Sequence, residues 1–105
     1  MYLPKHFQAF KTNFPDIHAN FEQLAKTCRD HGPLDQKTQD LVKLGIAIGQ
    51  NSRGGVMSNA RKALSSGATS EEIHHAVLMS LTTVGFPAMI AAMGWVDELL
   101  EKNQD

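Results

Sequence analysis

Cysteine is nearly absent from this sequence of 105 residues, which contains only Cys28. A single cysteine cannot close a disulfide within the chain, and a chain with 42% hydrophobic residues does not need one to build a core. The lack of a disulfide framework therefore favours a reducing, cytoplasmic location. The length predicts a single domain spanning residues 1–105, since one core usually fills a chain of roughly 100 to 150 residues.

An excess of charge of either sign is also lacking. Ten Lys and Arg residues oppose eleven Asp and Glu residues, which gives a formal net charge of -1 at pH 7. Without a basic field, we expect neither a nucleic acid nor an anionic membrane as a partner. The apolar stretch from Leu41 to Gly49 contains Lys43 and is far shorter than the roughly 20 residues that cross a bilayer. We therefore expect a soluble protein with no membrane partner.

Strand-like alternation of apolar and polar residues is missing as well, which predicts an all-α fold of about five to six helices. Pro4 fits the first turn of a leading helix, which the segment 13–16 interrupts. The next helix carries an apolar stripe that ends before residues 31–33, with Ile17, Phe21, Leu24, Ala25 and Cys28 on it. As the last residue of that stripe, Cys28 is expected to be a buried, inert thiol.

The helix after Asp35, its expected N-cap, is apolar almost all round and is therefore predicted to be central. Gly45 and Gly49 in this helix suggest that another backbone passes close by. A further helix opens at Gly54 and Gly55 and ends at Gly67.

The segment Thr69-Ser70-Glu71-Glu72 fits a capping box and predicts a firm helix start. The buried stripe expected for that helix comprises Ile73, Ala76, Val77, Leu81 and Val84. A final helix begins at about Pro87 and carries Met89, Ile90, Met93, Val96, Leu99 and Leu100.

Three motifs in order carry a family resemblance between residues 34 and 100. They are Leu34-Asp35-x-Lys37-Thr38-x-Asp40-Leu41, Ala63-Leu64-x-x-Gly67-Ala68-Thr69-x-Glu71-Glu72-Ile73 and Gly85-x-Pro87-Ala88. In these the sequence resembles the carboxymuconolactone decarboxylase family, which includes the alkylhydroperoxidase D-like peroxidases. The resemblance implies a helical domain built on an antiparallel helix hairpin. It also implies a homo-oligomer, as a dimer, trimer or hexamer, with sites at or near subunit contacts.

The catalytic residues of the family are largely replaced in this sequence. Its peroxidases carry Cys-x-x-Cys-x-x-x-His, with an acidic residue twelve positions ahead of the first cysteine. By this resemblance Ser52 and Gly55 stand at the cysteine positions, Asn59 at the histidine position and Asp40 at the acidic one. Serine is not oxidised by peroxide and glycine has no side chain, so we do not expect dithiol peroxidase activity.

The decarboxylase branch uses the same histidine position for acid–base work. Asn59 can hydrogen-bond a carbonyl or carboxylate there but cannot carry a proton. That branch also has a second histidine after the Gly-x-Pro element, where this chain has Ala91. The sequence therefore departs from both catalytic patterns of the family.

A polar cluster nevertheless persists at the family's site. Asp40 is the candidate base, and the candidate substrate-binding residues are Ser52, Arg53, Ser58 and Asn59. Arg53 beside two glycines and a helix N-terminus suits a small organic anion. The structural alternative is that Asp40 pairs with Arg53 or a lysine, while Ser52 caps the helix.

We expect no metal and no cofactor. His74 and His75 are adjacent on a helix and point in different directions, so they do not form a two-ligand site on their own. Two functions remain open: a family enzyme with a remodelled site that binds or transforms a small organic anion, and a catalytically inactive oligomeric scaffold or binding module of the same fold.

Overall fold

The computed structural model describes residues 5–102, and within that range the chain forms six α-helices and no strand. This confirms the predicted all-α fold. The helices are distributed over two compact units, one ending at Pro33 and the other beginning at Leu34. The assignment of residues 1–105 to a single domain stays a prediction.

The first unit consists of α1 (Lys5–Asn13) and α2 (Pro15–Asp30). Pro15 begins α2, where its missing N–H costs nothing, and Phe14 stands at the N-cap position. The rings of Phe10 and Phe14 lie 5.8 Å apart between centroids and link the two helices. Neither helix has a buried residue. The expectation for Pro4 lies outside the described residues.

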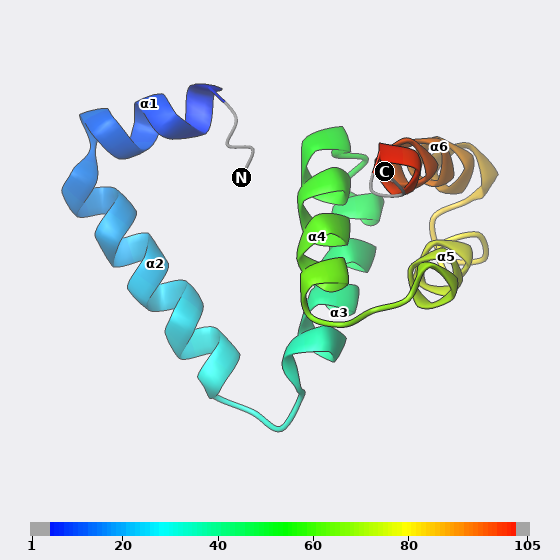
Figure 1. The fold of residues 1–105 in the computed structure, drawn as a ribbon, viewed down its shortest axis with the longest axis horizontal. Helices are drawn as coiled ribbons and strands as arrows, with labels where there is room; N and C mark the ends of the chain where they lie inside the picture. Colours follow the sequence, from blue (N-terminus) through cyan, green and yellow to red (C-terminus); the bar gives the residue numbers. More distant parts are fainter. Residues whose placement is uncertain (1–4, 103–105) are drawn as a thin grey trace. The chain divides into compact units, whose positions relative to one another are not determined.

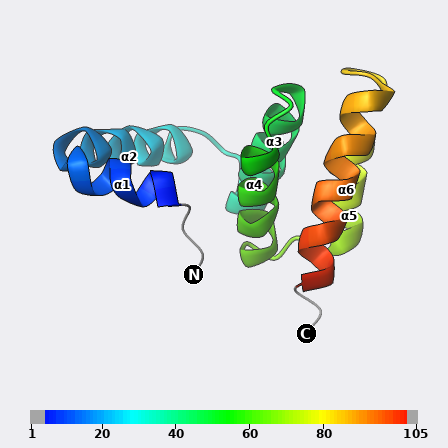
Figure 2. The ribbon, with the colours of Figure 1, turned by 90° about the horizontal axis from the view of Figure 1, so that it is seen from above.

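The second unit is built on two neighbouring helices, α3 (Gln36–Gly49) and α4 (Arg53–Ser65), which lie side by side in both views (Figures 1 and 2). Asp35 caps α3 as predicted, and its carboxylate accepts a 2.8 Å hydrogen bond from the Thr38 backbone N–H. Hydrogen bonds from the Thr38 side chain and backbone lower the pKa of Asp35. Residues 50–52 reverse the chain direction, so α3 and α4 form the expected antiparallel hairpin.

The helices α5 (Ser70–Leu78) and α6 (Phe86–Lys102) complete the second unit. Gly67 adopts a left-handed φ of +96° after α4, as expected for a glycine at that position. The predicted capping box of α5 is present, because Thr69 Oγ1 accepts from the Glu72 N–H while Glu72 accepts from the Thr69 N–H. Lys37 of α3 also contacts Glu72 across 2.9 Å and ties the starts of α3 and α5 together.

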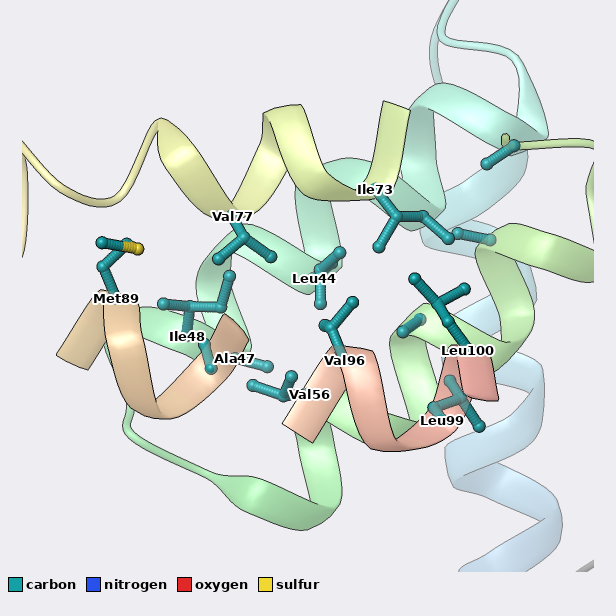
Figure 3. Packing of buried hydrophobic residues seen from close by; sticks show 14 residues of the cluster. Leu44, Ala47, Ile48, Val56, Ile73, Val77, Met89, Val96, Leu99 and Leu100 are labelled. Atoms are coloured by element: carbon teal, nitrogen blue, oxygen red, sulfur yellow. The ribbon is translucent and has the colours of Figure 1, made fainter. Parts of the chain in front are cut away.

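The core lies where α3 to α6 meet, and Figure 3 shows its side chains directed towards one another. Its largest members are less than 2% exposed, namely Leu44, Ile48, Val56, Ile73, Val77 and Val96. One apolar stripe from each helix therefore supplies the core, in agreement with the helical spacing of these residues in the sequence.

Several packing expectations are wrong. The helix α3 is not buried all round, since Val42 and Ile46 are about half exposed. A Cβ at Gly45 or Gly49 would meet no atom within 4 Å, so no described part of the chain passes close to them. The helix α5 ends at Leu78, before the expected Leu81 and Val84, and both of these side chains are exposed.

Ile90 lies on α6 outside the stripe that meets the core, and it is exposed. One further expectation of burial fails. Cys28 is exposed rather than buried, because the face of α2 on which it lies is not covered within the first unit.

Candidate functional site

The connection from α3 to α4 is held by a serine cap and a close-packed glycine. Ser52 is the N-cap of α4, and its Oγ accepts a 3.0 Å hydrogen bond from the Gly55 N–H. A Cβ on Gly55 would lie 2.9 Å from Ser52 Oγ and 3.2 Å from the Ala47 Cβ. The position that carries a cysteine in the peroxidases is thus closed to a side chain unless its neighbours shift.

An open hollow of about 310 Å³ lies beside this turn, on the surface of α3 and α4. Its lining residues come from one face of α3 and from the first turns of α4: Lys43, Ile46, Ala47, Gln50, Gly55 and Asn59. Lys43 makes no ion pair with any residue in the range 5–102. The Asn59 Nδ2 donates a 2.9 Å hydrogen bond to the Gly55 carbonyl, which leaves its second hydrogen as a donor and the side-chain oxygen as an acceptor. The hollow therefore combines a cation, two amides and apolar carbon.

Asp40 is 1% exposed and accepts a 2.6 Å hydrogen bond from the Ser66 Oγ. Ser66 is the C-cap residue of α4, so this bond ties the beginning of α3 to the end of α4. Asp40 lies nine residues before the end of α3, which places it about 14 Å along the helix axis from Gly49. It does not line the hollow.

Arg53 already holds a carboxylate of its own chain. Its guanidinium lies 3.2 and 3.3 Å from the two oxygens of Glu98 on α6. Both contacts come from Arg53 Nη2, and both side chains are about half exposed, so this pair contributes little to stability but directs the guanidinium towards Glu98. Ser58 is half-buried on α4 and, like Arg53, does not line the hollow.

Among the five candidate residues predicted from the sequence, only Asn59 lines the hollow, and it does so beside Gly55. The sequence-based reasoning missed Lys43 and Gln50. The sequence does contain a pattern that groups these two residues, because positions 43, 46, 47 and 50 have the spacing of one helix face. In the sequence, Lys43 interrupts the apolar stretch 41–49 and marks where this helix face becomes polar.

The histidines on α5 lie apart from the hollow. His74 Nε2 is 2.7 Å from Asp97 Oδ1 of α6, which links these two helices at the surface. His75 is exposed. Across residues 5–102, no three His, Cys, Asp or Glu side chains are grouped so that they could hold a metal ion. None of the helices in that range is long and apolar enough to span a membrane.

The family can be assigned once this geometry is compared with known proteins. A family model described as the carboxymuconolactone decarboxylase family matches residues 15–98. The chain belongs to the carboxymuconolactone decarboxylase family. This confirms the resemblance inferred from the three motifs, and the match includes α2, which lies ahead of them.

Two known proteins are similar to this chain over most of its length. An uncharacterised protein of Methanocaldococcus jannaschii is 27% identical over 100 residues, which cover 94% of this chain and 96% of the relative. A crystal structure of a carboxymuconolactone decarboxylase family protein from Legionella pneumophila, in its apo form, superposes with a TM-score of 0.81. The two chains are 23% identical, and the match covers 91% of this chain and 86% of the other. This second likeness concerns the fold.

Proposed function

We propose that this family member binds a small organic anion in the hollow between α3 and α4. The observation that carries the proposal is the Lys43 ammonium, which has no ion pair within residues 5–102 and stands beside the amides of Gln50 and Asn59. Ile46 and Ala47 add apolar surface next to these polar groups. A carboxylate on a short hydrocarbon body matches this combination, because it needs a cation and hydrogen-bond donors at one end only.

The roles of the other candidate residues follow from their contacts. Ser52 keeps the turn in place by capping α4, and Arg53 is engaged by Glu98. We therefore assign the anion to Lys43 and to a hydrogen bond from the second Nδ2 hydrogen of Asn59, since its first hydrogen is held by the Gly55 carbonyl. Binding is proposed ahead of catalysis, because Asp40 is bonded to Ser66 and lies outside the lining of the hollow.

The test is a titration of the protein with a panel of aliphatic and aromatic carboxylates, followed by calorimetry and amide chemical shifts. We expect the shifts to cluster around residues 43–59, and Lys43→Met to weaken binding about tenfold, which corresponds to about 1.4 kcal/mol. Lys62→Met is the matched control, since Lys62 is an exposed lysine of α4 that does not line the hollow. Equal affinities of the Lys43→Met variant and the unaltered protein would overturn the proposal.

Catalysis is tested with lactone, β-keto acid and peroxide substrates. Turnover that disappears in Asp40→Asn would establish an enzyme with Asp40 as its base. No turnover, together with unchanged ligand binding in that variant, is expected for a binding module. Because Ser52 and Gly55 replace the cysteine pair, we expect no dithiol peroxidase activity.

We also propose that the protein is a cytoplasmic homo-oligomer, as a dimer, trimer or hexamer. The second unit leaves a large group of apolar side chains exposed around the α5–α6 connection: Leu78, Met79, Leu81, Val84, Phe86 and Ile90. No charged residue occurs between His75 and Asp97, so this surface offers nothing ionic to water. The exposed free thiol of Cys28 supports a reducing compartment.

A further inference from the structure

The apolar face of α2 has no partner in the first unit. Phe14, Ile17, Phe21 and Leu24 are 52%, 57%, 57% and 63% exposed, and neither α1 nor α2 has a buried residue. The helix α1 reaches only one edge of this face, through Phe10 against Phe14 and Phe7 against His18. Four large apolar side chains aligned on one exposed helix face indicate a surface that another helix covers.

The spacing of this face is that of a coiled coil. Residues 14, 17, 21, 24 and 28 are separated by three, four, three and four positions, which is the a/d pattern that keeps one seam facing a partner helix. We call these five residues, Phe14, Ile17, Phe21, Leu24 and Cys28, the α2 seam. It runs along the whole of α2, from the N-cap to within one turn of Asp30.

The flanks of the α2 seam carry no formal charge at pH 7. The residues beside it are His18, Asn20, Ala25 and Thr27. The charged residues of α2 are further from the seam, and Lys26 is already paired with Asp30 on its own helix. An identical helix can therefore approach without repulsion, whereas nothing on the flanks selects a partner of opposite charge.

We infer that the α2 seam pairs with the α2 seam of a second copy of this chain, with the two helices antiparallel. In an antiparallel pair centred between Phe21 and Leu24, the seam residues of the two helices meet in four layers. Ile17 of each helix faces Cys28 of the other helix. Phe21 of each helix faces Leu24 of the other. Every layer joins a β-branched or aromatic side chain to a less bulky one. The parallel register would instead place Phe21 on Phe21 and Cys28 on Cys28. Antiparallel helices also oppose their dipoles favourably.

The area that this contact can bury indicates a weak association. The exposed parts of the seam residues amount to on the order of 800 Å² over two copies, below the ~1,200 Å² of stable interfaces. The pairing is thus a concentration-dependent two-fold contact. This inference rests on the proposed homo-oligomer and specifies one of its interfaces.

The register is tested by oxidative cross-linking with copper phenanthroline. Ile17→Cys places a thiol opposite Cys28 of the second copy, so we expect a covalent dimer on a non-reducing gel. Residues 17 and 28 of one helix lie about 16 Å apart, so the cross-link cannot form within one chain. The unaltered protein and the Ala19→Cys variant, whose new thiol lies opposite the seam, are expected to remain monomeric on that gel. Cross-linking of the unaltered protein through Cys28, or none in Ile17→Cys, would overturn the register.

The interface itself is tested by analytical ultracentrifugation across a concentration series. Phe21→Asp is expected to lower the association constant at least tenfold and Ala19→Asp to leave it unchanged, with circular dichroism confirming the helix content of both. If both variants associate like the unaltered protein, the seam is wrong while the homo-oligomer stands. If the unaltered protein is a monomer throughout, both proposals fail.

Discussion

The two units carry apolar stripes of similar spacing on their helices. They differ in how far these stripes are buried: α3 to α6 bury theirs, whereas α1 and α2 do not. In the second unit each stripe meets three others, and Leu44, Ile73 and Val96 are completely buried. In the first unit two helices lie together with no buried residue at all. Helical periodicity therefore predicts which face is apolar, whereas burial depends on how many such faces converge.

Two leucines give the sharpest test of this difference. Leu44 is 0% exposed in α3 and Leu24 is 63% exposed in α2. We expect Leu44→Ala to lower the free energy of unfolding by about 2–5 kcal/mol, because it removes core contacts and leaves a cavity. Leu24→Ala should change it by less than about 0.5 kcal/mol at low protein concentration. Urea unfolding followed by circular dichroism measures both, and equal losses would contradict the comparison.

The second unit also buries a polar contact, the hydrogen bond from Ser66 to Asp40. Ser66→Ala removes a hydrogen bond to a buried carboxylate and should cost about 1.5–3 kcal/mol. Ser58→Ala is the control, because the Ser58 side chain is half-buried on the same helix and makes no hydrogen bond within residues 5–102. A loss in Ser58→Ala as large as that in Ser66→Ala would show that the bond to Asp40 contributes nothing.

The two glycines that open α4 differ in the space around them. A Cβ on Gly54 would meet no atom within 4 Å, so Gly54→Ala should stabilise the helix by about 0.5 kcal/mol. A Cβ on Gly55 would displace the Ser52 cap and press on Ala47, so Gly55→Ala should cost up to about 1 kcal/mol. Thermal unfolding of the two variants checks the sign, and a stabilised Gly55→Ala would show that the cap is dispensable.

Local signals in the sequence predict the helix caps and the turn after α4. The caps at Asp35 and Thr69 and the left-handed turn at Gly67 depend on residues within a few positions of each other, and all three are confirmed. The end of α5 was missed, because Leu81 and Val84 continue its apolar pattern although the helix stops at Leu78. Exposure of Val42 and Ile46 could not be predicted either, since it depends on which faces of α3 the other helices reach.

The candidate site was harder to predict than the fold. Asn59 was found through its position relative to the family motif, and Lys43 was not, because it belongs to no motif. The contact from Arg53 to Glu98 joins residues 45 positions apart, so spacing along one helix cannot reveal it. Sequence patterns therefore identified the region of the site, while long-range contacts decide which of its polar groups remain available to a ligand.

The smallest expected effect is the loss of stability at low pH that comes from Glu72 in the first turn of α5. The backbone N–H of Thr69 and then the Lys37 ammonium lower the pKa of Glu72. This pKa is lower in the folded than in the unfolded chain. The stabilisation is therefore present above the ordinary glutamate value of about 4.3 and is lost as the pH falls through the lowered one.

Glu72→Gln keeps an acceptor for the capping box but removes the charge, so it should reduce Tm slightly at pH 7, and this difference should disappear as the pH falls through the lowered pKa of Glu72. Glu71→Gln is the control on the same helix turn, since the Glu71 side chain makes no contact of this kind within residues 5–102. A difference between Glu72→Gln and the unaltered protein that stays the same as the pH falls through the lowered pKa of Glu72 would show that the cap depends on packing around the side chain and not on its charge.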